Sequence, residues 1–275
     1  MTRVNRRVLP GFRLSLGYAV LYMSLLVLIP LAACFIKAAS LDWAQFAAAV
    51  WTPRARAAYG LTLGASLVAA VINVPLGTLI AWVLVRYQFP LRRVLDALID
   101  LPFALPTAVA GLVYSSLYVE NGWLGQYLVP LGIQGAYTRL AIVLVLVFIG
   151  LPFVVRTVQP ILEDFEAEVE EAAACLGASR GQTFVRVILP SLMPAIVTGF
   201  ALAFARGLGE YGSVVFVSGN MPFRTEIAPV LIVASLEAFK YGEAAAIAVV
   251  LLLMSFTMLV VINLLERWSK SYASL

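Results

Sequence analysis

Six long apolar runs dominate this chain, and five of them contain no charged residue. They occupy residues 14–36, 57–85, 101–119, 140–155, 192–217 and 244–265. A helix of about 20 apolar residues crosses the hydrocarbon core of a bilayer, whereas a water-soluble domain of this size cannot bury six such segments. We therefore predict an all-α integral membrane protein with six transmembrane helices.

The composition leaves no room for a sizeable soluble domain. Of 275 residues, 62% are hydrophobic and 12% are charged, and the mean hydropathy is +0.96. We expect short termini at 1–13 and 266–275 and a single transmembrane domain at 14–265. The Leu-Ala-Ala-Cys sequence ending at Cys34 also fits a lipoprotein signal peptide, but the apolar run continues past it, which favours a retained helix.

Several function classes lack the residues that they need. The chain has no histidine, the commonest general base and metal ligand, which argues against catalysis and against a metal site. Cys34 lies in an apolar run and Cys175 in a polar loop, so no disulfide framework is expected. The net charge of +4 comes from basic residues at the ends of apolar runs, which argues against a nucleic-acid partner.

Lysines and arginines are distributed unequally between alternate loops. One set of loops and termini holds twelve: Arg3, Arg6, Arg7, Arg13, Arg86, Arg92, Arg93, Arg156, Arg180, Arg186, Arg267 and Lys270. The other set holds six: Lys37, Arg54, Arg56, Arg139, Arg224 and Lys240. Because cytoplasmic loops carry the excess, we predict that both termini are cytoplasmic and that 156–191 is the longest cytoplasmic loop.

Proline and glycine recur inside two of the runs, at 73–77 (Asn-Val-Pro-Leu-Gly) and 101–106 (Leu-Pro-Phe-Ala-Leu-Pro). Helix breaks at membrane depth are tolerated where neighbouring helices or a cavity satisfy the freed backbone groups. Each site is compatible with a kink that lets helices pack, and the pair is also compatible with a channel.

The 156–191 loop begins with a strongly patterned segment. Over 161–177, apolar residues recur at spacings of three and four with carboxylates between them, which predicts one helix that ends at Gly177. Small residues near its end leave a surface that a partner can approach closely: Ala172, Ala173 and Ala174.

A second short helix is predicted after the bend. Ser179 followed three positions later by Gln182 is a capping-box pattern that starts a helix over 180–188. Leu189 and Pro190 should end it, because proline disrupts a helix interior. The loop is therefore expected to project from the membrane as a helix-turn-helix.

The motif Glu171-Ala172-Ala173, Gly177, Val187 and Leu189-Pro190 resembles, in its spacing, the cytoplasmic loop of ABC-importer permeases. The family usually has Ile at the position of Val187, an exchange that keeps the shape. In the family, this loop is a coupling helix that sits in a groove of the ATP-hydrolysing subunit. The resemblance implies type I importer architecture and assigns ATPase coupling to six residues: Glu171, Ala172, Ala173, Gly177, Leu189 and Pro190. An ordinary amphipathic connector is the alternative.

Two further stretches resemble the sulfate/thiosulfate permeases: 105–111 (Leu-Pro-Thr-Ala-Val-Ala-Gly) and 206–222, which begins Arg-Gly-Leu-Gly-Glu-Tyr-Gly-Ser. Residues 225–229 (Thr-Glu-Ile-Ala-Pro) are most similar to the T subunit. The resemblance implies a bacterial inner-membrane protein that pairs with a homologous W permease subunit, two ABC ATPase subunits and a periplasmic sulfate-binding protein. Molybdate permeases share the Leu-Gly-Glu signature and remain an alternative.

Arg206 and Glu210 lie within a predicted span, where ionisable groups are expensive and commonly functional. Four residues apart, they share a helix face and can neutralise each other. Nearby glycines permit close approach of another backbone: Gly207, Gly209 and Gly212. Residues assigned to a translocation pathway are Arg206, Glu210, Ser213 and Asn220, with Ser218 as a further group that could replace hydration of sulfate. A structural ion pair is the alternative, and no high-affinity sulfate site is expected in this chain.

The chain lacks a Gly-x-x-x-x-Gly-Lys-Ser/Thr phosphate loop, so we assign ATP-Mg to the partner ATPase and expect no cofactor here. ATP-driven closure of that partner would bias a two-state helix bundle. Outer residues 219–240, with an amphipathic helix over 227–236, could dock the binding protein or lie on lipid. An ion-driven secondary transporter or a purely structural protein would leave the loop spacing unexplained.

Overall fold

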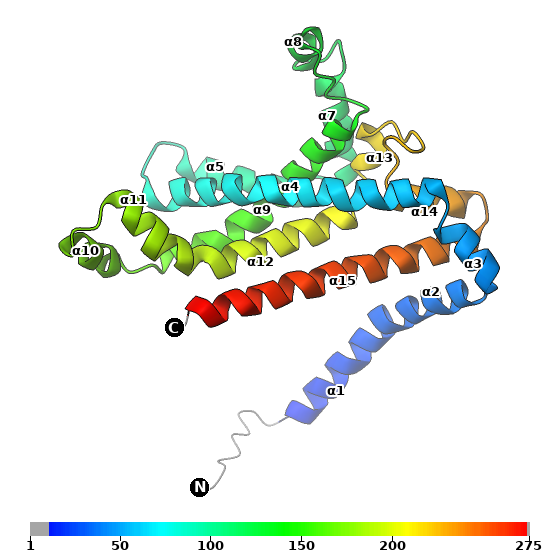
Figure 1. Cartoon of the computed structure of the whole chain (residues 1–275), viewed down its shortest axis with the longest axis horizontal. Coiled ribbons are helices and arrows are strands. Elements are labelled where there is room, and N and C mark those ends of the chain that lie inside the picture. Colours follow the sequence, from blue (N-terminus) through cyan, green and yellow to red (C-terminus); the bar gives the residue numbers. More distant parts are fainter. Residues whose placement is uncertain (1–10, 274–275) are drawn as a thin grey trace.

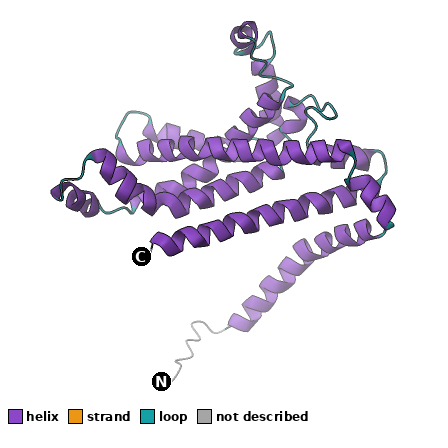
Figure 2. Ribbon diagram, viewed as in Figure 1, coloured by secondary structure: helices purple, strands orange, loops and turns teal. Residues whose placement is uncertain are grey.

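The computed structural model describes residues 11–273, and every regular element in that range is helical (Figure 2). In chain order the elements are α1 (Phe12–Met23), η1 (Ser24–Leu28), α2 (Ile29–Ala39), α3 (Trp43–Val50), α4 (Pro53–Arg86), α5 (Arg92–Ile99), α6 (Leu101–Ala104), α7 (Thr107–Tyr118), α8 (Gly125–Leu128), η2 (Val129–Leu131), α9 (Arg139–Glu163), α10 (Ala167–Cys175), α11 (Arg180–Thr183), η3 (Phe184–Ile188), α12 (Leu189–Leu208), α13 (Val214–Val217), α14 (Ala228–Glu237) and α15 (Tyr241–Ala273). The predicted all-α fold is confirmed.

Five helical segments are long and apolar enough to cross a membrane in the described part of the chain. They are Leu14–Ala39, Pro53–Arg86, Arg139–Glu163, Arg180–Leu208 and Tyr241–Leu264. The other predicted span, 101–119, differs because Leu105 and Pro106 interrupt it, and α7 has only 12 residues. Each of the three helices in this region contacts α9: α5, α6 and α7. In Figure 1, α7 and α8 project away from the main bundle.

The core of the bundle consists of α4, α9 and α12, which all pack against one another. Small residues allow this proximity: a Cβ on Gly77 of α4 would lie 2.7 Å from the Cβ of Val154 on α9. A Cβ on Gly199 of α12 would likewise lie 2.8 Å from the Cα of Val154. Residues 73–77 therefore serve close packing, and α4 continues through Pro75 without ending.

The two ends of the bundle carry different elements (Figure 1). α10 and α11 lie at one end together with the C-terminal end of α15, whereas α3 and α14 lie at the opposite end. The loops that the basic-residue count groups together, 87–91 and 164–179, thus lie at the same end.

The prediction of one continuous helix over 161–177 is wrong. α9 ends at Glu163, residues 164–166 are not helical, and α10 begins at Ala167. Phe165, inside this break, packs against the main apolar cluster of α4, α9 and α12. Burial of that ring bends the chain where the periodicity alone indicates a continuous helix.

The prediction that Pro190 ends the second helix is also wrong. The capping box of Ser179 and Gln182 is present as predicted, but the helix that it starts runs on to Leu208. The short π-helix η3 ends at Ile188, two residues before Pro190. It widens the backbone hydrogen-bond ladder where the proline ring would otherwise collide with the preceding turn. The loop and the following span therefore form one continuous segment.

Candidate functional site

The predicted coupling residues lie around α10, at the end of the bundle that also carries α11 (Figure 1). Glu171 and Ala172 are exposed, whereas Ala173 is buried against its neighbours. Gly177 is exposed and has a φ of +85°, a left-handed conformation that favours glycine. Leu189 and Pro190 lie at the start of α12, half-buried and exposed respectively.

An apolar surface faces outward beside these residues. Leu176 is 90% exposed, and Val169 and Val185 are also exposed. Contacts hold α10 against α11 and η3, so these exposed side chains come from elements that pack together. Exposed apolar side chains gathered at one end, next to exposed carboxylates, are typical of a protein docking surface.

Arg86, the last residue of α4, is one of the basic residues that predict the membrane topology. In the structure it also makes a specific contact. Its guanidinium forms an ion pair with Glu170 on α10 and lies 5.2 Å above the ring centroid of Trp82. Glu170 directly precedes the Glu-Ala-Ala motif, and this position was the signal in the sequence that could have pointed to it. The two partners are 84 positions apart, so local spacing could not reveal the pair.

A second arginine ties the third predicted span to α9 at the same end. Arg156 donates to Asp100 at 2.9 and 2.7 Å and to the carboxylate of Asp96 at 2.6 Å. Gln159 also accepts from Arg156, at 2.8 Å. This cluster holds α5 and the start of α6 on α9 and was not predicted.

Arg206 and Glu210 form the ion pair that their spacing predicts, with Nη1 and Oε2 2.6 Å apart. Glu210 is only 2% exposed, and its second oxygen accepts from both the N–H and the hydroxyl of Ser213 at 2.9 Å. α12 has already ended at Leu208, so the predicted run 192–217 is not one helix. Glu210 stabilises the turn by accepting from the residue that precedes α13.

Two of the three predicted glycines lie close to other helices. A Cβ on Gly212 would lie 2.2 Å from Oγ1 of Thr107, and one on Gly207 would lie 3.0 Å from Oγ of Ser66. A Cβ on Gly209 would meet no neighbouring element within 4 Å. The pathway candidates therefore lie where the turn 209–213 meets α4 and α7.

The other two polar candidates use their groups locally. The hydroxyl of Ser218 donates to Oδ1 of Asn220 at 2.8 Å, and Nδ2 of Asn220 donates to the carbonyl of Val215 at 2.7 Å. Asn220 has a φ of 50°. These bonds shape the turn after α13.

Long-range contacts of two arginines hold the opposite end of the bundle. Arg54, at the start of α4, forms two bonds with Glu226, at 2.7 and 2.6 Å, and Glu226 is 4% exposed. Arg139 donates to the carbonyl of Arg224 at 2.8 Å. The loop between α13 and α14 is thereby attached to α4 and α9. α14 itself packs on α15 and α4, so the predicted outer helix is part of the bundle.

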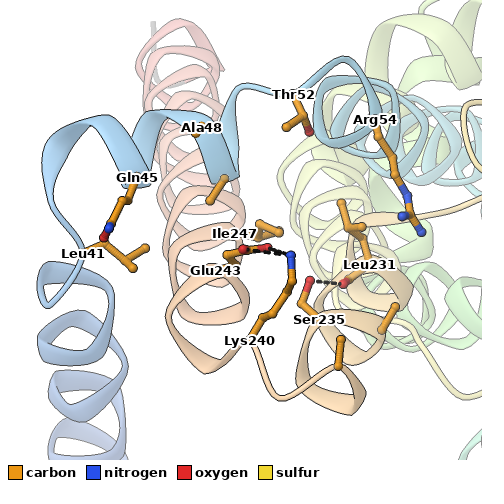
Figure 3. A pocket seen from close by; sticks show the side chains of 13 residues that line it. Leu41, Gln45, Ala48, Thr52, Arg54, Leu231, Ser235, Lys240, Glu243 and Ile247 are labelled. Atoms are coloured by element: carbon orange, nitrogen blue, oxygen red, sulfur yellow. Dashed lines mark hydrogen bonds and ion pairs between the residues drawn. The ribbon is translucent and has the colours of Figure 1, made fainter.

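A cavity of about 770 Å³ opens at this end between α3, α14 and α15 (Figure 3). Lys240 and Glu243 form an ion pair in it with atoms 3.1 Å apart, and Ser235 donates to the carbonyl of Leu231. The cations of its lining, Arg54 and Lys240, both have carboxylate partners. In the described residues no cluster of His, Cys, Asp and Glu is arranged to bind a metal ion.

Comparison with known proteins decides the family. Residues 73–271 match the family described as the binding-protein-dependent transport system inner membrane component. The chain belongs to this family. Membership identifies it as a membrane component of an ABC transport system rather than an enzyme.

Similar proteins cover nearly the whole chain. The sulfate transport system permease protein CysT of Escherichia coli strain K12 is 49% identical over 262 residues, which is 95% of both chains. CysT of Synechococcus elongatus is 52% identical over 91% of this chain and 90% of its own. A probable CysT of Nephroselmis olivacea is 49% identical over 99% of this chain and 94% of its own.

Solved structures establish the fold independently. A bacterial alginate ABC transporter, in complex with an alginate-bound periplasmic protein, has a TM-score of 0.76 at 17% identity and covers 97% of this chain and 98% of its own. The MetNI methionine ABC transporter in an inward-facing conformation has a TM-score of 0.53 at 16% identity, covering 84% and 99%. The fold is that of type I ABC importer permeases.

Proposed function

We propose that this chain is the T-type permease subunit of an ATP-driven importer for sulfate and thiosulfate. The observation that carries the proposal is the surface formed by α10, Gly177 and the exposed Leu176, at the end of a bundle whose close relatives are sulfate permeases. A molybdate or other oxyanion importer is the second candidate, since both substrates are tetrahedral dianions.

The proposed topology follows from the distribution of basic residues. Both termini (1–13 and 266–275) and the coupling loop 156–191 are cytoplasmic, and 14–265 forms one permease domain in the bacterial inner membrane. The position of α10 and the C-terminal part of α15 at one end supports this arrangement. The outer segment 219–240 then faces the periplasm.

The proposed partners are a homologous W permease subunit, two ABC ATPase subunits and a periplasmic sulfate-binding protein, with membrane lipid around the bundle. Glu171 and the apolar Leu176 would dock in the ATPase, which binds ATP-Mg. Because α12 is continuous with the loop from Arg180 onward, a displacement of the loop moves a transmembrane helix directly. ATP binding would then shift the bundle between two orientations.

Within the membrane, Arg206 is the proposed contact for the substrate. Its side chain is 33% exposed whereas that of Glu210 is buried, so Arg206 is the more accessible member of the pair. Partial neutralisation by Glu210 suits transport, because a fixed free cation would hold sulfate too tightly for release. Ser213 and Asn220 have a positioning role in this proposal, since their polar groups bond within the turn.

The direct test is uptake of labelled sulfate by proteoliposomes that contain this chain with its candidate partners. We expect sulfate uptake to require both ATP and the binding protein. The Glu171→Lys variant should show less uptake, and molybdate should inhibit uptake only weakly. Uptake driven by an ion gradient without the ATPase would refute the importer. Uptake of molybdate in preference to sulfate would favour the second candidate.

A further inference from the structure

The coupling helix α10 has few attachments to the membrane bundle. Non-helical residues 164–166 separate it from α9, and its main helix contacts are with α11 and η3. The ion pair between Glu170 and Arg86 therefore provides a direct link from α10 to α4. Because the pair joins residues 84 positions apart in the chain, it fixes the position of α10 relative to α4.

The geometry around Arg86 joins three elements. Its guanidinium pairs with Glu170 and stacks over Trp82, and the Trp82 ring meets Phe184 of η3 edge-on, with centroids 5.4 Å apart. The side chains of Arg86 and Glu170 are 26% and 29% exposed, so solvent screens this pair less than a surface pair.

α4 is suited to carry displacement from this end to the other. It is a continuous helix of 34 residues, which corresponds to about 51 Å. At its outer end, Arg54 forms the two bonds to Glu226 that attach the loop before α14. One helix thus has an ionic anchor at each end, one to α10 and one to the outer loop.

We propose that Arg86 is a positioning residue that fixes α10 to α4, so that movement of the coupling helix is transmitted along α4 to the outer loop. The role in transport rests on the proposed function, whereas the positioning of α10 does not.

The first experiment tests positioning without ATP or substrate. In a Cys34→Ser background, a spin label on the exposed Cys175 at the end of α10 reports the mobility of that helix in the purified full chain. Arg86→Glu and Glu170→Arg should each sharpen the spectrum, and the double variant with both changes should restore it. Arg93→Glu, an exposed charge at the same end, is the matched control and should change nothing. Unchanged mobility in both single variants would overturn the proposal.

The second experiment measures coupling in the reconstituted transporter. Arg86→Glu leaves α10 itself unchanged, so it should keep its ATPase subunit on purification and its basal hydrolysis. In both single variants, uptake and the hydrolysis stimulated by loaded binding protein should fall roughly fivefold or more. The exchanged pair should recover most of both activities. Wild-type uptake that needs no ATP would refute the proposed function and leave the mobility result intact. ATP-dependent uptake that both single variants retain would instead refute transmission through Arg86.

Discussion

Replacement of Glu210 should destabilise the bundle more than any exposed charge does. Three donors converge on this carboxylate: Nη1 of Arg206 at 2.6 Å and the N–H and hydroxyl of Ser213 at 2.9 Å each. Breaking a buried ion pair costs about 3–5 kcal/mol, and the partial exposure of Arg206 places this pair near the lower limit. We expect Glu210→Ala to lower the free energy of unfolding by about 3 kcal/mol.

The measurement is equilibrium unfolding in mixed micelles, followed by circular dichroism during titration with dodecyl sulfate. The double variant Arg206→Gln/Glu210→Gln should be less destabilised than the sum of its single variants by about 1 kcal/mol or more, because no charge is left alone. Lys240→Gln, from the exposed pair with Glu243, is the control and should change stability by less than about 1 kcal/mol. An unchanged midpoint for Glu210→Ala, or strict additivity of the two Gln changes, would refute this account.

Two glycine substitutions give further predictions. Gly111→Val should destabilise the fold by about 3 kcal/mol or more, since a Cβ there would lie 2.2 Å from the backbone oxygen of Ser213; Gly60→Val, with no neighbour within 4 Å, is the control in the same unfolding titration. Gly177→Val should add about 1–3 kcal/mol of local strain at its φ of +85° and lower ATP-dependent uptake while the chain still inserts. Gly181→Val, also in open space but without a positive φ, should leave uptake nearly unchanged; equal loss in both variants would contradict the conformational argument.

Much of the local structure follows from patterns of a few residues. Four of the five charge-free runs coincide with long helices, because a lipid-facing backbone must bond within its own segment. The capping box of Ser179 and Gln182 and the four-residue spacing of Arg206 and Glu210 are likewise local, and both interactions occur in the structure. Family motifs in the loop identified the importer class, which the comparisons then established.

Only the tertiary structure decided where helices break and which distant charges meet. Phe165 packs in the core and interrupts the predicted helix. The helix that begins at Arg180 continues through Pro190 because the π-helix η3 accommodates the proline ring. The pairs Arg86–Glu170 and Arg54–Glu226 join residues 84 and 172 positions apart. Periodicity and capping act within a few turns of helix, whereas these contacts depend on how whole helices pack. The sequence by itself therefore determined the membrane helices and their family. Packing determined how those helices are linked.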